Sequence, residues 1–376
     1  MIAIGAVQLR EIRLPLREPF RISSGSVHER RVLLLEVSDS DGRKAWSECV
    51  AAEYPNYSAE TVDTAWLALQ QWLIPEVLGR RFDHPSDVHR HLESRVRGHR
   101  MAKGALEMGC WGLAAELAGV PLARLIGGER ESVEVGVSLG IETTADRLAQ
   151  RATREAKAGY RKIKLKIKPG YDVQFVRAVR DVLPAAALMV DANAAYGPED
   201  TASLLAMDGL GLTMIEQPFS GEDLLRHAAL QLRLETPLCL DESITSPARV
   251  EDMLSLGSGR IVNVKPGRVG GFTPSLEIHD RCHSDGVPVW CGGMLETGIG
   301  RAYNVALASL PGFSMPGDLS PSRRYWERDI VHPEWTMSAN GTVEVPTAPG
   351  IGVEVDREQV EQLTVRQCAL RTSGNS

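Results

Sequence analysis

The sequence predicts an α/β protein whose larger part is a closed ring of alternating strands and helices, preceded by an α+β unit. From about residue 132, short and mostly apolar runs typical of strands alternate with helix-like stretches such as DRLAQRATREAKAG (146–159). This order implies a parallel sheet with right-handed crossovers. An eighth run at GFSMPG (312–317) favours a closed β/α barrel over an open sheet. The seven preceding runs are SVEVGVSLG, KIKLKI, ALMVDAN, LTMIEQP, PLCLDES, RIVNVKP and VPVWCGG.

The first 125 or so residues lack this alternation. They predict strands at 2–14 and 31–38, joined by the polar loop EPFRISSGSVHER, and helices at 60–78 and 101–118. Gly119 directly after the second helix is a suitable C-cap. Near the C-terminus, the segment WTMSANGTVEVP alternates around an Asn-Gly pair, which predicts a hairpin that belongs with this first unit. The final TSGNS is expected to be frayed.

The composition narrows the class of protein. With 376 residues, 43% hydrophobic and 24% charged, the chain is long and apolar enough to fold. A net charge of −7 argues against nucleic acid as the main partner. No long uncharged apolar run and no signal-peptide pattern is found, so a cytoplasmic protein without a membrane span is expected. None of the six cysteines forms a CxxC pair, and Cys291 is expected to be a packing residue.

Five ionisable residues stand at the ends of five consecutive predicted strands. They are Lys166, Asp191, Glu216, Asp241 and Lys265, at separations of 25, 25, 25 and 24 residues. That period is about one βα unit, so the side chains should meet at the C-terminal mouth of the barrel, where barrel enzymes place their active sites. A single acid after a strand is more often a turn former or helix cap, but five in register are not explained in that way.

Three carboxylates that converge at one mouth repel each other and require a neutralising positive charge. Because the set offers only oxygen ligands, a hard cation is predicted: Mg²⁺, with Mn²⁺ as an alternative.

The lysines of KIKLKIK share one strand face at period two. In a barrel the apolar residues between them face the helices, so Lys164 and Lys166 point inward. The charge of Lys164 and a bound cation should depress the pKa of Lys166 towards working pH, which suits a general base. Lys265 lies four strands further round the ring and should face Lys166 across the mouth. A cation on a substrate carboxylate, flanked by opposed lysines, suits removal of an α-proton through a metal-stabilised enediolate.

At these residues the sequence resembles the enolase superfamily in its muconate lactonizing branch. Within that branch it is similar to the N-acylamino acid (N-succinylamino acid) racemases and o-succinylbenzoate synthases. The resemblance spans about residues 5–360. It is carried by the KxK pair, the three carboxylates, Lys265 and the fragments GHRMAKGALEMG, KLKIKPG, DANAAYG, IEQP, CLDES, NVKPGRVGG, PVWCGGMLETGIGRA and NVALASLP.

The resemblance implies a modified (β/α)7β-type TIM barrel beneath an α+β capping domain. It divides the chain into a capping domain at 1–128 completed by 328–368, a barrel at 129–327, and a tail at 369–376. Two cap loops, about 19–26 and 49–57, should close the pocket and supply specificity. The family also suggests a small carboxylate substrate and a homo-oligomer.

The resemblance also assigns roles. Lys166 and Lys265 are the two acid/base groups, Lys164 polarises the substrate carboxylate, and the metal ligands are the three carboxylates named above. Substrate contacts are expected from Ser138, Asn193, Gly292, Gly293 and Met294, with Arg268 in a supporting position linked to racemase activity. Glu296 is left open between a supporting acid and a helix cap.

The expected function is an Mg²⁺-dependent N-succinylamino acid racemase, an o-succinylbenzoate synthase, or both, since both reactions begin with the same proton abstraction. Ala51 and Ala52 stand where relatives often carry a larger side chain, which leaves the substrate open. The alternatives are another cycloisomerase or epimerase of the same branch, a Schiff-base aldolase and a non-catalytic barrel. The chain reads VWCGG where a mandelate racemase-like enzyme would have a histidine, and GGMLETG where a dipeptide epimerase would have Asp-x-Asp.

Overall fold

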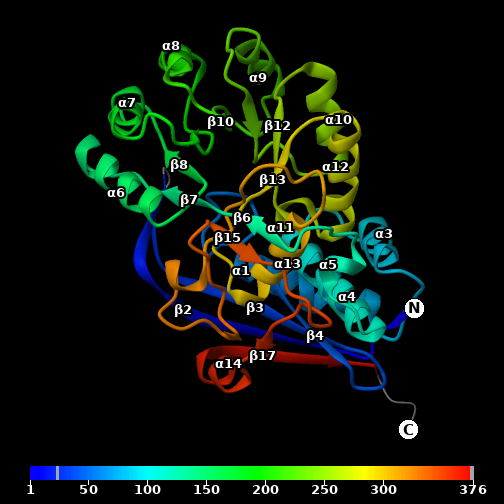
Figure 1. The fold of residues 1–376 in the computed structure, drawn as a ribbon. Coiled ribbons are helices and arrows are strands. Elements are labelled where there is room, and N and C mark those ends of the chain that lie inside the picture. The colour runs from blue at the N-terminus through cyan, green and yellow to red at the C-terminus, as the bar shows by residue number, and fades with distance from the viewer. Residues whose placement is uncertain (23–24, 373–376) are drawn as a thin grey trace.

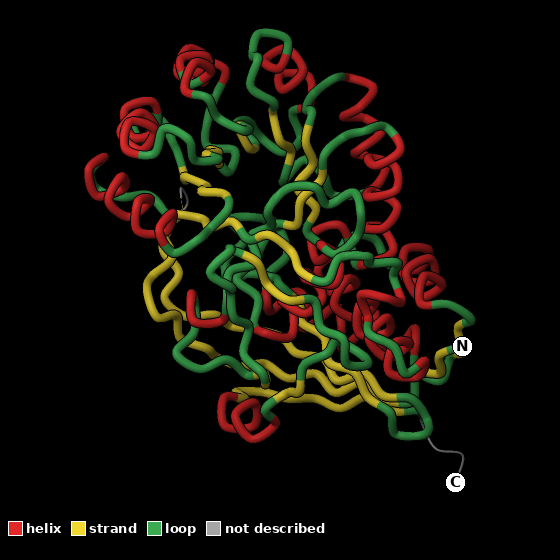
Figure 2. The backbone as a smooth tube through the Cα atoms, viewed as in Figure 1, coloured by secondary structure: helices red, strands yellow, loops and turns green. Residues whose placement is uncertain are grey.

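Seven parallel strands curl into the predicted ring, and helices cover its outside (Figure 1, Figure 2). The computed structural model describes residues 1–22 and 25–372. The strands neighbour one another in chain order: β7 (Gly136–Leu139), β8 (Lys162–Lys166), β9 (Leu188–Asp191), β10 (Ile215–Glu216), β11 (Leu238–Leu240), β12 (Ile261–Val264) and β13 (Val289–Cys291). The outer helices are α6 (Ala145–Lys157), α7 (Val173–Val182), α8 (Thr201–Ala206), α9 (Leu224–Gln231), α10 (Pro247–Leu256), α11 (Pro266–Val269), α12 (Phe272–Ser284) and α13 (Gly298–Ala308).

The prediction of an eighth regular strand at 312–317 is wrong. Within the described part of the chain, this segment makes single bridges that join Phe313 to Val289 of β13 and Gly317 to Val135, just before β7. Pro316 has no N–H to donate to a ladder, so continuous pairing is blocked. The segment still lies between β13 and β7, so it closes the ring although it forms no regular eighth strand.

The two faces of β8 have opposite character, as the alternation predicts. Ile163, Leu165 and Ile167 join an apolar cluster that includes Leu148 of α6 and Val176 of α7. The intervening lysines are therefore turned to the inside of the ring, where their long side chains reach the mouth or the floor of the barrel.

The N-terminal unit is an antiparallel sheet with helices packed on it. Its strands run in the order β17 (Thr364–Arg371), β2 (Ala6–Ile22), β3 (Gly25–Ser38) and β4 (Lys44–Cys49). The helices of this part are α1 (Val62–Ala68), the π-helical turn η1 (Leu69–Leu73), α2 (Ile74–Val77), α3 (Pro85–Arg95), α4 (Arg100–Ala118), α5 (Leu122–Leu125) and α14 (Arg357–Leu363). The two predicted helices are confirmed, and Gly119 ends α4 with a left-handed φ of 67°.

Short elements complete the fold. The two-residue strands pair as β1 (Ile2–Ala3) with β5 (Arg81–Phe82) and β14 (Val331–His332) with β16 (Glu354–Val355). Single 3-10 turns are η2 (Pro198–Asp200), η3 (Asp208–Leu210) and η4 (Ser322–Arg324).

Three sequence predictions need correction. The polar stretch 18–30 is largely strand, because β2 and β3 continue to Ile22 and from Gly25; these hairpin arms extend beyond the apolar core, and their polarity hides them. The Asn-Gly turn exists, and Ser338 N–H donates to the Thr342 carbonyl across it, but 335–338 forms no strand; the strand after the turn, β15 (Thr342–Glu344), pairs with β6 (Ser132–Glu134). The tail begins later than residue 369, because β17 pairs with β2 as far as Arg371. The domain boundaries at 128/129 and 327/328 stay predictions.

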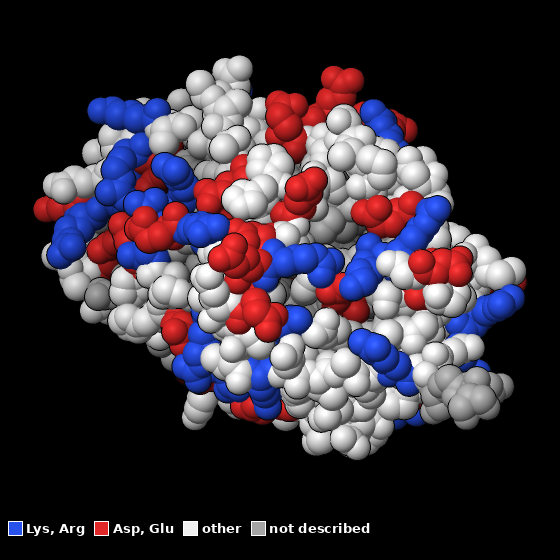
Figure 3. Space-filling view, turned by 90° about the horizontal axis from the view of Figure 1, so that it is seen from below, with Lys and Arg blue, Asp and Glu red and all other residues white. Residues whose placement is uncertain are grey.

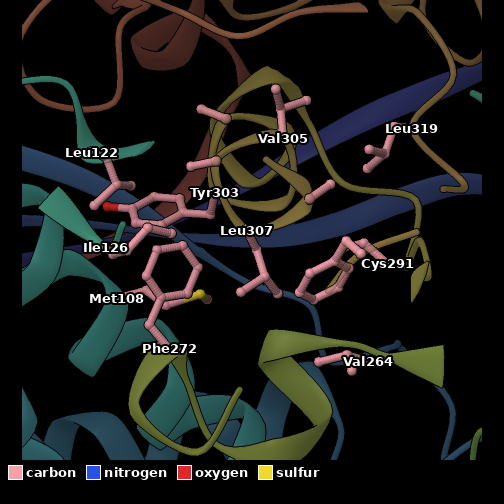
Figure 4. Close-up of a cluster of buried hydrophobic side chains, with 14 of the residues drawn as sticks. Met108, Leu122, Ile126, Val264, Phe272, Cys291, Tyr303, Val305, Leu307 and Leu319 are labelled. Carbon is pink, nitrogen blue, oxygen red and sulfur yellow. The ribbon is translucent and has the colours of Figure 1, made fainter. Parts of the chain in front are cut away.

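An apolar cluster joins the N-terminal helices to the barrel (Figure 4). Met108 of α4 lies beside Phe272 of α12 and Tyr303 of α13. The rings of Phe272 and Tyr303 meet edge-on, with centroids 5.5 Å apart. The cap sheet and the barrel are therefore connected by one continuous core.

Two buried glutamates of the N-terminal unit cap helices of the barrel. Glu48 of β4 accepts hydrogen bonds from the Thr297 amide (3.0 Å) and the Gly300 amide (3.1 Å) at the start of α13. Glu107 of α4 accepts from the amides of Phe272 (2.7 Å) and Thr273 (2.9 Å) at the start of α12. Each carboxylate satisfies free N–H groups and meets the positive end of a helix dipole.

Replacing Glu48 by glutamine is expected to flatten the pH dependence of stability. Burial raises the pKa of Glu48 to about 7, against the opposing bond from Thr297. Because this folded-state value lies above the unfolded value of about 4.3, the folded form is favoured by protonation and loses stability as pH rises from about 4.5 to 7, by on the order of 3 kcal/mol. Urea unfolding of wild type and Glu48→Gln at pH 5 and pH 8 measures the difference. If the free energy of unfolding changed by the same amount between pH 5 and pH 8 in both proteins, Glu48 would not be the source of this pH dependence.

The distribution of charged side chains on the described surface agrees with the mixed charges of the sequence. On the face shown in Figure 3, basic and acidic side chains are interleaved, so that face carries no continuous field of one sign. Within residues 1–22 and 25–372, no helix is both long and apolar enough to cross a membrane.

Candidate active site

The five strand-end residues meet at the C-terminal mouth of the barrel. Parallel register places Lys166 opposite Asp191, and Asp191 opposite Glu216. Asp241 directly follows β11, and Lys265 directly follows β12. All three carboxylates are buried.

Lys166 is held by two oxygens. Its Nζ lies 2.6 Å from Asp191 Oδ2 and 2.6 Å from Asn193 Oδ1. Asn193, in the left-handed region with φ 44°, donates its Nδ2 to Glu242 Oε1 over 3.1 Å. Burial raises the pKa of Glu242 to about 7. The position of Lys166 therefore depends on a chain of side chains from β9 and β11.

Lys265 belongs to a second group, centred on Asp241. Lys265 Nζ lies 2.7 Å from Asp241 Oδ2, while Arg268 of α11 contacts Asp241 Oδ1. Tyr57, from the second predicted cap loop, donates to Asp241 Oδ1 over 2.9 Å and lies 3.2 Å from Lys265 Nζ. Arg268 is itself fixed by the carbonyl oxygens of Ile244 (2.7 Å) and Asn263 (2.5 Å). The cap loop, the arginine and the lysine thus share one carboxylate.

Lys164 occupies the centre of the site. Its Nζ contacts Asp318 and lies 3.4 Å from both Asp191 Oδ2 and Glu216 Oε2. Burial opposes its charge, but these carboxylates raise the pKa of Lys164 well above its usual range. Asn263 donates to the other oxygen of Glu216 over 2.6 Å.

One layer deeper, Lys162 lies over the Trp290 ring, with Nζ 3.5 Å from the centroid. Its Nζ is buried and has no hydrogen-bond partner among the described residues, and burial lowers its pKa to about 8. A cation–π contact therefore takes the place of a hydrogen bond at the barrel floor.

The three carboxylates fit a hard cation by chemistry. Burial, followed by the charge of Asp191, raises the pKa of Glu216 to about 8, as expected for acids that crowd one another. Within the described residues, no three acidic, histidine or cysteine side chains lie close enough to hold an ion as they stand, and Asp191 and Asp241 each bond to a lysine. Three carboxylates from adjacent strands, exchanging ammonium partners for a cation, match the oxygen ligands that Mg²⁺ prefers.

The segment after β13 approaches the site closely. A Cβ on Gly292 would lie 2.6 Å from Lys265 Cε and would displace the lysine, and one on Gly293 would lie 2.8 Å from the backbone carbonyl oxygen of Asp318. Glu296 Oε1 accepts from the Met294 amide over 2.9 Å and from Asn304 over 2.8 Å, across Leu295 with φ 58°. Glu296 thus bonds the turn that carries Met294, while Glu48 caps the helix.

The remaining predicted positions surround this centre. Ser138 is buried opposite Lys164 on β7, and its hydroxyl has no partner among the described residues. A cavity of about 570 Å³ opens beside the site and is lined by Tyr57, Asn193, Glu242 and Arg268 among others. A second cavity of about 580 Å³, between β2 and α6, is lined by residues such as Glu18, Glu142 and Arg151 and by none of the site residues named above. The first cap loop, 19–26, includes residues 23–24, which lie outside the described residues.

Sequence reasoning missed Tyr57, Asn263 and Asp318 as parts of the site. Asn263 had a signal, because it precedes Lys265 by two residues and so shares its strand face. Tyr57 lies within the predicted cap loop, but nothing in the sequence directs its hydroxyl to Asp241. Asp318 directly follows the irregular segment 312–317, and that segment has no strand pattern from which the position of Asp318 could be predicted.

Comparison with known proteins agrees with this geometry. Residues 4–127 match the model of the mandelate racemase / muconate lactonizing enzyme N-terminal domain, and 147–360 match the enolase C-terminal domain-like family. The o-succinylbenzoate synthase of Geobacillus kaustophilus is 48% identical over 363 residues, covering 96% of each chain. The N-succinylamino acid racemase of Thermus thermophilus is 44% identical over 370 residues, covering 98% of this chain and 100% of the relative.

Solved structures give the same result. An enolase-superfamily member from Listeria innocua superposes with a TM-score of 0.96 at 38% identity and covers 99% of this chain and 100% of that one. A dipeptide epimerase from Cytophaga hutchinsonii, solved with Mg and a dipeptide, shares the fold at a TM-score of 0.90 and 23% identity, covering 98% of this chain and 100% of that one. With both family models matched over most of its length, this chain belongs to the enolase superfamily, in its mandelate racemase / muconate lactonizing enzyme group.

Proposed function

We propose that this protein is an Mg²⁺-dependent enzyme that removes the α-proton of a small carboxylate substrate, as an N-succinylamino acid racemase, an o-succinylbenzoate synthase, or both. The observation that carries the proposal is the placement of Lys166 and Lys265. They end strands four positions apart in the ring, and each is anchored to a different carboxylate of the candidate ligand set. The names of the relatives at 44–48% identity support the same two activities.

Each side chain has a distinct task in this proposal. Lys164 binds and polarises the substrate carboxylate, and Asn193 orients Lys166 to take the α-proton from one face. In racemisation Lys265 returns a proton to the other face. In the synthase reaction Lys265 remains a cation that stabilises the negative charge. Mg²⁺, held by Asp191, Glu216 and Asp241, would supply positive charge at the substrate carboxylate.

The charge count of the site supports an anionic substrate. Lys166 must be neutral to take the α-proton, so four charged basic side chains face five acidic ones when the other groups are ionised. A divalent cation then leaves an excess of one positive charge, which a substrate carboxylate would offset. The groups are Lys162, Lys164, Lys166, Lys265, Arg268, Asp191, Glu216, Asp241, Glu242 and Asp318.

The test is turnover by the purified protein with Mg²⁺. Each enantiomer of N-succinyl amino acids is followed by polarimetry, and the hydrated precursor of o-succinylbenzoate by its absorbance. Turnover of at least one class is expected. Inactivity towards both, with a lysine trapped by borohydride in the presence of a carbonyl substrate, would overturn the proposal in favour of Schiff-base chemistry.

Replacing Arg268 by glutamine is expected to separate the two activities. Arg268 and Lys265 bind opposite oxygens of Asp241, so loss of the guanidinium shifts the orientation and charge environment of Lys265. Racemisation needs Lys265 to transfer a proton, whereas the synthase reaction needs only its charge. We expect racemase kcat/KM to fall at least about tenfold more than synthase kcat/KM, about 1.4 kcal/mol in transition-state stabilisation. Equal losses in both reactions would make Arg268 a structural residue.

The family also suggests a homo-oligomer, which light scattering during size-exclusion chromatography tests. A cytoplasmic location stays a prediction.

A further inference from the structure

Lys164 is surrounded by three carboxylates that are not equivalent. Asp191 and Glu216 each lie 3.4 Å from its Nζ, and both belong to the proposed ligand set. Asp318 makes the closest contact of the three and belongs to no strand of the ring. It is the carboxylate of this group that stays available to Lys164 when the other two are engaged.

The backbone of Asp318 is fixed from three sides. Its amide donates to the Cys291 carbonyl over 2.9 Å, and its carbonyl accepts from Arg301 Nη1 over 2.7 Å. Gly293 packs against the same carbonyl so closely that a Cβ would lie 2.8 Å from it. Arg301 is buried on α13. Both backbone polar groups of Asp318 are thus hydrogen-bonded at the point where its carboxylate enters the site.

The second oxygen of Asp318 faces another lysine. Lys162 Nζ lies 3.9 Å from Asp318 Oδ1, and the Trp290 ring supports it from below. One oxygen therefore serves Lys164 and the other faces Lys162. Both oxygens of Asp318 are therefore turned towards ammonium groups.

We propose that Asp318 is a positioning residue for Lys164, holding its ammonium where it meets the substrate carboxylate after Asp191 and Glu216 have been engaged elsewhere. The inference deepens the proposed function and rests on it. Asp318 itself touches neither substrate nor metal in this assignment, so its effect on turnover passes entirely through Lys164.

The first test compares Asp318→Asn with Asp329→Asn. Asp329 is also a buried aspartate from the C-terminal part of the chain, but it accepts from Ser322 and the Gly298 amide and contacts no lysine of the site. Displacing Lys164 by about 1 Å is expected to lower kcat/KM by about 10²-fold in Asp318→Asn. The change in Asp329→Asn should stay below about threefold at equal folded fraction. A loss of similar size in both variants would overturn the proposal.

The second test is a double-mutant cycle, which a merely structural role would not satisfy. Lys164→Met should lose most activity, and adding Asp318→Asn to it should change the remaining α-proton exchange in D₂O by less than about twofold. If the two losses of activity multiply in the double variant, Asp318 acts independently of Lys164. If Asp318→Asn does not fold, the same cycle with Asp318→Glu, which keeps the charge, makes the same distinction.

Failure of the proposed function is distinguishable from failure of this inference. If wild type turns over neither substrate class, the function is wrong, and the cycle is then measured by thermal unfolding. Coupling between Lys164→Met and Asp318→Asn in Tm is expected. Additive Tm shifts would show that Lys164 and Asp318 are not energetically coupled, and the assignment would then be wrong.

Discussion

Replacing Lys166 by alanine is expected to lower racemase kcat/KM by about 10²–10⁴-fold in both directions, the usual contribution of a positioned general base. Lys265→Ala should have the same effect, because a complete turnover uses both lysines. Each variant should still exchange the α-hydrogen of one enantiomer with deuterium, through the lysine that remains. Mass spectrometry of each N-succinyl enantiomer in D₂O measures this asymmetry.

The matched control is Lys168→Ala. Lys168 continues the same alternation two residues further on, but its Nζ lies over the Tyr171 ring at 4.9 Å. This variant should retain activity within about threefold of wild type. Equal residual exchange of both enantiomers in Lys166→Ala or Lys265→Ala would show that the two lysines do not flank the substrate.

Removal of the metal is expected to abolish turnover, and Glu216→Gln is expected to abolish the stabilisation that the metal gives. EDTA should stop the reaction, and Mg²⁺ or Mn²⁺ should restore it. In wild type, Mg²⁺ at about 100 times its Kd should stabilise the fold by about 2.7 kcal/mol. Glu216→Gln keeps an oxygen for Asn263 and removes one of the crowded charges, so the metal-free fold should survive while the Mg²⁺-dependent rise in Tm disappears.

Thermal unfolding with and without Mg²⁺ measures this prediction independently of activity. Glu222→Gln is the control, since Glu222 lines the neighbouring cavity and is exposed. Its Tm should respond to Mg²⁺ as wild type does. Full turnover in chelator, or an unchanged Mg²⁺ response in Glu216→Gln, would contradict the ligand assignment.

The 25-residue spacing was sufficient to place five side chains at one mouth. In a parallel ring each strand end faces the same way, so sequence period becomes spatial proximity. The hydrogen-bond and ion-pair partners of those side chains could not be predicted in the same way. From the sequence, Asp241→Asn is expected to lose metal affinity and leave the fold intact. In the structure Asp241 is buried against Lys265, Arg268 and Tyr57, so that variant also weakens two buried ion pairs and should destabilise the fold.

The errors share one physical origin, which is pairing between distant segments. The Asn-Gly turn is a local property and is present, with Gly341 at φ 70°. Which strand then receives β15 depends on β6, some two hundred residues earlier, and no local pattern encodes that choice. Closure of the ring by 312–317 is of the same kind, since Phe313 and Gly317 contribute only single bridges.

The pairing of β17 with β2 has a consequence for how the chain is made. Leu9 of β2 is paired with Cys368 of β17, so one edge of the cap sheet is supplied only after the whole barrel has been translated. Domains generally fold in the order in which they leave the ribosome. Here the first unit to emerge waits with an open edge on β2, which is a site for pairing with other nascent chains. The cap sheet is therefore completed last, when β17 pairs with the edge of β2 that was synthesised first.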